Sequence, residues 1–225
     1  MTDSSAAGAA VYSPMVLALY DAWVLGISNR YAWRCSTQQV LLPFFASHVK
    51  AQHLDIGVGT GYYLAKTPLP PETTVTLLDL NPSSLEAAKR RIDRANTRTI
   101  RHDVMTPLPG AQRFDSISLF YLLHCLPGPL AHKTRIFAHL KHNLLPNGVL
   151  FGATILGDGA EHNAFGRKLM KVYNSKGIFG NRQDTVAGFE AALREHFTDV
   201  TLRQEGCVLM FTASRPMDVE SAAAI

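Results

Sequence analysis

The chain has 225 residues, of which 47% are hydrophobic and 18% charged, and its formal net charge is +4 at pH 7. This length provides for one domain with a sizeable core, and the composition is that of a globular protein rather than a fibrous or disordered one. Its lysines and arginines are scattered and form no basic stripe, so we expect no nucleic-acid partner.

We expect no targeting signal in the N-terminal segment. Residues 1–10 are small and polar, lack Lys and Arg, and are expected to be a disordered tail, as are residues 216–225. The apolar stretch that begins at Pro14 is interrupted by Asp21 and is shorter than the roughly 20 residues that cross a bilayer. We therefore expect a cytoplasmic protein with no membrane partner.

Metal binding is not expected. The cysteines are far apart and show neither metal nor disulfide spacing: Cys35, Cys125 and Cys207. His132, His139 and His142 lie on a predicted helix, with no carboxylate or cysteine converging on them, and are interpreted as a solvated face.

Strands and helices alternate along residues 50–215. The expected strands cover 51–57, 74–80, 97–104, 114–123, 149–156, 199–206 and 207–215. The expected helices cover 61–67, 81–95, 132–145 and 184–197. This alternation predicts an α/β fold with a parallel sheet wound by helices on both sides, and the last two strands form a hairpin that adds an antiparallel edge.

Two of the helices carry clear end signals. Asn81 is placed to cap the helix over 81–95, and Leu85, Ala88 and Ile92 supply its buried stripe. The helix over 132–145 is expected to stop at the sequence PNG, with Gly148 in the turn.

Residues 11–49 and 158–182 fall outside this alternation. Both segments mix aromatic with polar residues. In an open α/β sheet the ligand crevice lies at the carboxyl ends of the strands, which segments before the first strand and after the fifth can cover. We expect a helical cap over 11–49 and a lid over 158–182 that together form a substrate pocket. The alternative is that they only cover apolar sheet surface.

A glycine-rich turn follows the first strand. In the sequence LDIGVGTG, Gly57, Gly59 and Gly61 allow positive φ and let a ligand approach the backbone. Tyr62 stands where the dinucleotide pattern requires a small residue, which counts against a pyrophosphate ligand.

Two acidic residues end the next strands at the same edge of the sheet. Asp79 follows the glycines by roughly 20 positions and is placed to bind ribose hydroxyls; its alternative role is to cap the following helix, a role that Asn81 already fills. Asp103, with the backbone N–H of Val104, can recognise adenine, or Asp103 can be a turn residue.

The order and spacing of LDIGVGTG, LLDLNP, RHDV and FDSISLFYLLHCLP resemble the class I S-adenosylmethionine-dependent methyltransferases, over about Gln52 to Arg215. The resemblance implies a Rossmann-like, doubly wound, seven-stranded, mostly parallel sheet whose last strand is antiparallel. It assigns the methionine part of the cofactor to Asp55, Gly57, Gly59 and Gly61, ribose to Asp79 with Leu80 beside it, adenine to Asp103 and Val104, and the region near the methyl group to Phe120 and Tyr121.

The loop after the fourth strand reads FYLLHCLPG instead of the N-P-P-Y type, and resembles the branch that acts on small molecules. We expect methylation of a small, aromatic or largely apolar metabolite, on oxygen first and nitrogen second, with the oligomeric state left open. Alternatives are a NAD-dependent oxidoreductase, against which Tyr62 and Asp103 speak, and a non-catalytic protein that binds the cofactor.

Two residues are candidates for the chemistry itself. His124 stands at the end of the fourth strand and is either the base that takes a proton from a hydroxyl acceptor or a histidine packed under the lid. Tyr20 is either a ring that stabilises the sulfonium or an aromatic residue that packs on the sheet.

Overall fold

The structure, a computed structural model, describes residues 21–217. The expected tail over 1–10, Tyr20 and most of the expected tail over 216–225 lie outside the described residues.

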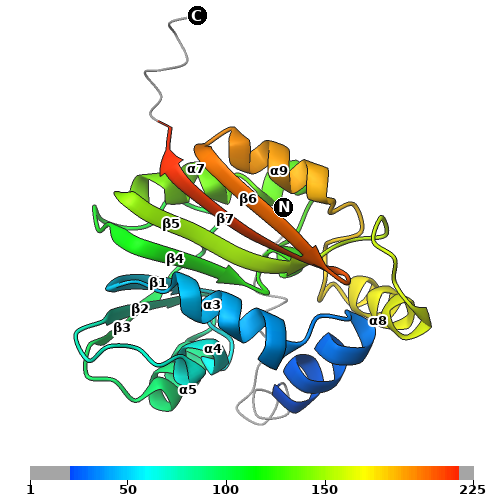
Figure 1. Cartoon of the computed structure of the whole chain (residues 1–225), viewed down its shortest axis with the longest axis horizontal. Helices are drawn as coiled ribbons and strands as arrows, with labels where there is room; N and C mark the ends of the chain where they lie inside the picture. Colours follow the sequence, from blue (N-terminus) through cyan, green and yellow to red (C-terminus); the bar gives the residue numbers. More distant parts are fainter. Residues whose placement is uncertain (1–20, 218–225) are drawn as a thin grey trace, which may run out of the picture.

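A seven-stranded sheet with the order β3-β2-β1-β4-β5-β7-β6 forms the centre of the molecule (Figure 1). The strands are β1 (Gln52–Ile56), β2 (Thr74–Asp79), β3 (Thr97–Arg101), β4 (Phe114–Phe120), β5 (Leu144–Ile155), β6 (Phe197–Glu205) and β7 (Val208–Pro216). The pairs among β1 to β5 are parallel, and β7 is antiparallel to both of its neighbours. The expected α/β fold with an antiparallel last strand is confirmed.

The last hairpin adds an antiparallel edge to the sheet, as predicted. The last strand does not form the edge, because β7 inserts between β5 and β6 and leaves β6 outermost. Val208 to Phe211 of β7 are all buried, whereas β6 alternates between exposed and partly buried residues. The more apolar strand therefore takes the interior position, where both of its faces are covered.

Helices cover both faces of the sheet and bury a core on each side (Figure 1). One face carries α3 (Leu42–His48), α4 (Tyr62–Lys66) and α5 (Pro82–Ile92); the other carries α6 (Leu130–Lys133), α7 (Ile136–Leu140) and α9 (Val186–Arg194). As predicted, the Asn81 side chain caps α5 by accepting a hydrogen bond from the N–H of Ser83 at 2.9 Å, and Leu85, Ala88 and Ile92 are buried.

The expected helix over 132–145 is wrong in its extent. It is divided into α6, α7 and a short turn over Lys141–Asn143, and β5 already begins at Leu144. Leu144 pairs with Phe114, and the register then shifts so that Val149 pairs with Ser116. The PNG sequence is therefore a bulge within β5, because pairing with β4 outweighs the local helix-stop signal.

The segment before β1 forms two further helices, η1 (Asp21–Ala32) and η2 (Thr37–Leu41), which lead into α3. Helix η1 packs against α8 (Ala164–Ser175) of the 158–182 segment (Figure 1). The indole N–H of Trp23 donates to the Tyr173 hydroxyl at 2.9 Å, and the rings of Trp23 and Phe165 meet at 6.3 Å. The two segments expected to form a cap and a lid therefore lie against each other.

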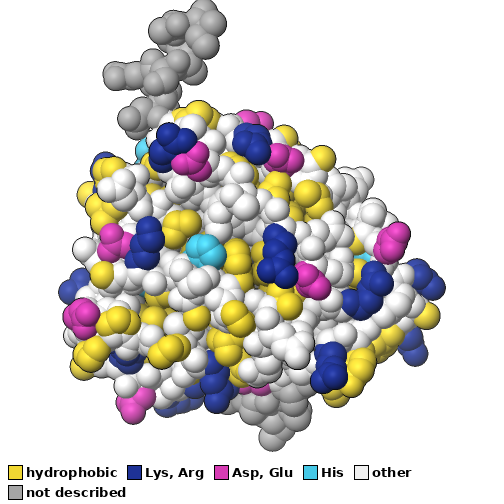
Figure 2. Space-filling view, viewed as in Figure 1, with side chains coloured by type: hydrophobic (Ala, Val, Ile, Leu, Met, Phe, Trp, Pro, Cys, Tyr) yellow, Lys and Arg dark blue, Asp and Glu magenta, His cyan; other side chains and the backbone are white. Residues whose placement is uncertain are grey.

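Within residues 21–217, no helix combines the length and the hydrophobicity needed to cross a membrane. In the same range no group of three or more His, Cys, Asp or Glu side chains is arranged to hold a metal ion. On the face drawn in Figure 2, basic and acidic side chains are interspersed.

Candidate active site

The turn between β1 and α4 leaves open space above one of its three glycines. Gly57, Gly59 and Gly61 have φ values of 74°, 51° and 69°. A Cβ atom on Gly57 would lie 2.9 Å from the Leu122 side chain, and one on Gly61 would lie 2.9 Å from the backbone of Ala88. A Cβ on Gly59 would meet nothing within 4 Å. Gly57 and Gly61 are thus required by packing, and Gly59 is the position where a ligand can touch the backbone.

Asp55 lies beneath this turn, near the end of β1. Its side chain is buried and accepts a hydrogen bond from the Ser118 hydroxyl of β4. Burial raises the pKa of Asp55 to about 7, and the neighbouring Asp79 carboxylate also raises it, while the Ser118 hydrogen bond lowers it. A cation that binds at the turn would therefore lower the pKa of this carboxyl group.

Asp79 connects the end of β2 to the glycine turn. Its carboxylate accepts the backbone N–H of Asn81 at 2.8 Å, and the backbone N–H groups of Gly59 and Val58 are near enough to lower its pKa. Burial raises the pKa of Asp79, and these backbone donors lower it. Capping of α5 belongs to Asn81, so the ribose role predicted for Asp79, with Leu80 beside it, stays a prediction consistent with this location.

Asp103 follows β3 and forms a turn. Its Oδ1 accepts the Met105 N–H at 3.0 Å, and its carbonyl accepts the Thr106 N–H at 3.0 Å. The Val104 side chain is buried in the core beside Ile56 and Leu78. Asp103 therefore lies in a turn, and the predicted adenine contact by Asp103 and Val104 stays a prediction at the same edge of the sheet.

Phe120 is the last residue of β4 and Tyr121 follows it, but the two side chains lie in different environments. Phe120 is buried in an aromatic cluster, where its ring lies 4.9 Å from both Phe45 and Tyr63. Tyr121 has a φ of 59°, in the left-handed region that aromatic residues rarely adopt, and its N–H donates to the Ala153 carbonyl at 2.8 Å. Such backbone strain is common at functional sites, which favours the predicted place of Tyr121 beside the methyl group.

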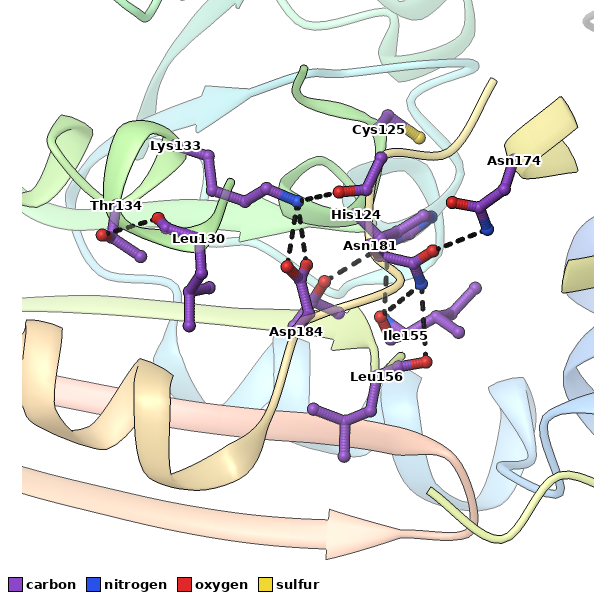
Figure 3. Close-up of polar contacts among 12 residues, drawn as sticks. His124, Cys125, Leu130, Lys133, Thr134, Ile155, Leu156, Asn174, Asn181 and Asp184 are labelled. Atoms are coloured by element: carbon purple, nitrogen blue, oxygen red, sulfur yellow. Dashed lines mark hydrogen bonds and ion pairs between the residues drawn. The ribbon is translucent and has the colours of Figure 1, made fainter. Parts of the chain in front are cut away.

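His124 is buried under the 158–182 segment (Figure 3). Its Nδ1 accepts the Ile155 backbone N–H at 3.3 Å, and the Thr154 hydroxyl lies 3.4 Å from the same nitrogen. Burial lowers the pKa of His124 to about 3, and the nearby Lys133 charge lowers it further. Because Nδ1 already accepts a hydrogen bond, the ring proton resides on Nε2. These observations favour the packing role over the base role.

Sequence reasoning missed a buried ion pair that holds the end of this segment in place. The ammonium of Lys133 donates to the Asp184 carboxylate at 2.9 and 3.1 Å and to the Gly180 carbonyl at 2.7 Å (Figure 3). The Asn181 amide donates to the Ile155 carbonyl at 2.9 Å. No local pattern marks this pair, since its partners are 51 positions apart.

Backbone hydrogen bonds join the two ends of the same segment. The N–H of Gly157 donates to the Asp184 carbonyl at 2.9 Å, and that of Asp158 to the Arg182 carbonyl at 3.0 Å. A Cβ atom on Gly157 would collide with the carbonyl oxygens of Asn181 and Arg182, so a glycine is needed where the segment leaves β5.

A second missed contact joins the N-terminal cap to the glycine turn. The Asp21 carboxylate accepts the Thr60 hydroxyl at 2.7 Å and pairs with Arg91 of α5. Arg91 also donates to Thr60 at 3.1 Å, and its guanidinium lies 5.2 Å from the centre of the Tyr62 ring. The large residue at position 62, which argued against a pyrophosphate site, therefore forms part of the contact between cap and turn.

The 158–182 segment lines a cavity of about 620 Å³. Polar residues on its wall include Asp158, Glu161, His162, Arg167, Lys171 and Arg182. A chain of ring contacts leads from this cavity to the end of β4: His162 with Trp33, Trp33 with Phe179, Phe179 with His124, and His124 with Tyr121, at 5.9, 6.1, 4.5 and 5.4 Å. Aromatic rings of both segments thus border Tyr121, and these rings are themselves buried.

Residues 54–150 match a family model described as a methyltransferase domain. The chain is 46% identical to the physcion biosynthesis cluster O-methyltransferase of Aspergillus chevalieri, over 93% of this chain and 95% of that protein. It is 43% identical to the N-methyltransferase vrtF of Penicillium aethiopicum, over 95% of this chain and 90% of that protein.

Solved structures share the fold at low sequence identity. The DhpI–SAH complex aligns over 94% of this chain and 96% of its own, with a TM-score of 0.67 and 13% identity. The N-methyltransferase NodS of Bradyrhizobium japonicum, in complex with S-adenosyl-L-homocysteine, aligns over 90% of this chain and 98% of its own, with a TM-score of 0.63 and 15% identity.

Proposed function

Since the chain belongs to the class I S-adenosylmethionine-dependent methyltransferases, we propose that it methylates a hydroxyl group of a small, aromatic or largely apolar metabolite. Its cofactor is S-adenosylmethionine, so the alternative prediction of a NAD-dependent oxidoreductase is wrong. Nitrogen is the second candidate acceptor, because one relative is named an N-methyltransferase while others are named O-methyltransferases.

The residues at the glycine turn fit this cofactor. When bound, S-adenosylmethionine supplies a methyl group on a sulfonium, which leaves the protein to position the acceptor in line. The open space over Gly59 accommodates the methionine part, and we assign Asp55 to its ammonium. Asp79 would accept hydrogen bonds from the ribose hydroxyls. Asp103 and the Val104 N–H would hold adenine.

The surroundings of Tyr121 support an aromatic acceptor. The rings of Trp33, Phe179 and His124 continue from Tyr121 toward the lid, and an acceptor bound among them would pack against flat apolar rings. The observation that carries the proposal is the combination of the free face of Gly59 with this aromatic border at the same edge of the sheet.

His124 does not supply the base in this proposal. Its proton-accepting nitrogen is engaged by the Ile155 amide, so an acceptor hydroxyl must lose its proton by another route. A phenol, with a pKa of about 10, or a carboxylic acid ionises far more readily than an alcohol. We therefore place phenols and carboxylic acids ahead of aliphatic alcohols as acceptors.

A methyl-transfer screen tests this assignment. The protein is incubated with S-adenosylmethionine and panels of phenols, carboxylic acids, aliphatic alcohols, amines and thiols, and methylated products are detected by mass spectrometry. Preferred transfer to phenols or carboxylic acids supports the proposal. Transfer confined to amines or thiols replaces hydroxyl methylation. If cofactor binds but no panel gives product, the non-catalytic alternative gains support. A cytoplasmic location and the absence of a nucleic-acid or membrane partner stay predictions from composition.

A further inference from the structure

Four polar side chains form a buried row beneath the glycine turn. His53 and Asp55 of β1 lie opposite Ser116 and Ser118 of β4 in the parallel register. None of the four is more than 6% exposed. His53 Nδ1 lies 2.8 Å from the Ser116 hydroxyl, and His53 Nε2 lies 3.2 Å from the Ser118 hydroxyl. Ser118 then donates to Asp55. The row thus runs from the middle of the sheet to the cofactor edge.

The carboxylate at the end of the row sets the direction of its hydrogen bonds, because an ionised Asp55 can only accept. At the other end, the Ser116 hydroxyl oxygen accepts the backbone N–H of Lys50 at 2.9 Å, which leaves its hydrogen available for His53. With Asp55 ionised, Ser116 donates to His53 Nδ1, His53 Nε2–H donates to Ser118, and Ser118 donates to Asp55. Every hydrogen in the row then points toward the carboxylate, an arrangement that stabilises its charge.

Water is kept from this row by aromatic rings. Phe45 and Phe151 lie 5.9 and 6.0 Å from the His53 ring. Burial lowers the pKa of His53 to about 3, so the imidazole is neutral and acts as a donor at one nitrogen and an acceptor at the other. The other titratable groups around Asp55 are Asp79 of β2 and, on the face shared with His53 and Phe120, Tyr63 of α4.

We infer that Ser118 and His53 are positioning residues, which hold Asp55 in the ionised form that binds the ammonium group of the cofactor. This inference rests on the proposed role of Asp55 in cofactor binding. It adds a function for two side chains that touch no ligand, because an isolated buried carboxylate would otherwise take up a proton and lose its attraction for a cation.

A measurable consequence is a proton released on cofactor binding. Burial raises the pKa of Asp55 in the cofactor-free protein to about 7, and the ammonium group binds the ionised form. Cofactor affinity therefore rises with pH up to about 7 and levels off above it. Loss of the Ser118 donor raises the pKa of Asp55 further, so this rise moves to higher pH.

The experiment measures binding of S-adenosylhomocysteine by calorimetry between pH 6 and 8.5, in two buffers of different ionisation enthalpy to count released protons. Ser118→Thr keeps the hydroxyl and Ser118→Val removes it at equal size. His53→Gln keeps an N–H donor and His53→Leu removes it, so the row is tested a second time at another residue. Ser84→Ala, at a buried serine of α5, is the control, and thermal unfolding reports on the fold of each variant.

We expect the pH midpoint of Ser118→Val to move up by about one unit, a shift worth about 1.4 kcal/mol, so that this variant binds about five-fold more weakly at pH 7 and about ten-fold more weakly at pH 6. His53→Leu moves the midpoint in the same direction by less. Ser118→Thr, His53→Gln and Ser84→Ala keep the parent profile. An unchanged pH profile in folded Ser118→Val or His53→Leu overturns the inference.

Asp55→Asn separates the inference from the function beneath it. If this variant binds S-adenosylhomocysteine as the parent does, with the same pH dependence, the cofactor role of Asp55 fails and the inference fails with it. If Asp55→Asn loses the pH dependence but Ser118→Val and His53→Leu do not change it, only the positioning role fails.

Discussion

The ammonium of Lys133 lies 2.9 Å from Oδ2 of Asp184, and neither side chain exposes more than 1% of its surface. The pair joins α6 to the segment that returns from the lid. We expect Lys133→Met to lower the free energy of unfolding by about 3–5 kcal/mol, because an uncompensated carboxylate remains buried. Chemical denaturation measures this loss.

A solvent-exposed ion pair provides the comparison for Lys133. Arg194 and Glu190 are four residues apart on α9 and are 52% and 41% exposed. Glu190→Ala is expected to cost no more than about 0.5 kcal/mol. Equal losses in the two variants would mean that the buried pair does not hold the return segment.

Gly59→Val is expected to abolish cofactor binding while the protein remains folded. A branched side chain would fill the space above the turn, and the positive φ adds strain of about 1–3 kcal/mol. Gly110 offers a matched control, since it also has a positive φ and open space around a Cβ atom but lies outside the site. Gly110→Val should lose similar stability and still bind S-adenosylhomocysteine; normal binding by Gly59→Val would place the ligand elsewhere.

Asp79→Ala is expected to weaken S-adenosylhomocysteine binding by about 1.5–3 kcal/mol, the scale of a hydrogen bond to a charged group, or roughly 10- to 150-fold in Kd. Because Asp79 also accepts the Asn81 amide, Asp79→Asn separates charge from acceptor geometry and should retain part of the affinity. Calorimetry on both variants, with Asp199→Ala as a surface control, tests the ribose role; unchanged affinity in Asp79→Ala contradicts it.

His124→Asn and His124→Ala distinguish packing from proton transfer. Asparagine can still accept the Ile155 amide, so we expect its variant to keep the rate within about ten-fold, whereas alanine leaves that amide unpaired and costs about 1–3 kcal/mol of stability. At saturating S-adenosylmethionine, where the pH dependence of cofactor affinity does not contribute, the rate of the parent enzyme should show no step near the ordinary histidine pKa of about 6.5. A folded asparagine variant that loses about 10²- to 10⁴-fold in rate on a hydroxyl substrate would restore the base role.

Asp55 makes the stability of the cofactor-free protein depend on pH. Its pKa is raised from 3.8 to about 7, so its protonated form stabilises the fold below about pH 4, and this contribution is lost as the pH rises through about 7. Asp55→Asn is neutral throughout and should gain on the order of 1–3 kcal/mol relative to the parent between pH 4.5 and 8. Denaturation curves of both proteins at pH 4.5 and pH 8 measure this difference in the free energy of unfolding. A difference that does not change with pH would exclude the raised pKa of Asp55.

Local patterns predicted much of this molecule. The glycine turn, the Asn81 cap and the strand–helix alternation depend on neighbours in sequence, and each is found where the pattern places it. The features that local patterns misplace or leave open depend on distant partners. Leu144, predicted to be helical, joins β5 because Phe114 lies opposite it. The order of the strands within the last hairpin is left open by local patterns, and β7 takes the inner position because its residues are buried.

The candidate site divides in the same way. Sequence motifs identify Asp55, Asp79 and Asp103 as candidate site residues, but they do not identify the hydrogen-bond partners of these carboxylates. Ser118 contacts Asp55 because β4 pairs with β1 in a register that places the two residues opposite each other. The Ile155 amide contacts His124 because β5 lies beside β4. A histidine at the end of a strand has the same appearance in sequence whether its nitrogen is free or engaged.

The ends of the lid segment lie side by side, since Gly157 and Asp158 bond to the backbone of Asp184 and Arg182. A segment that leaves and re-enters the body at one point is an exchangeable cassette: its sequence can be replaced or lengthened at small entropic cost while the sheet and the glycine turn keep their geometry. If the predicted lid role holds, we expect a relative's segment grafted between Gly157 and Asn181 to change acceptor preference while the fold is kept.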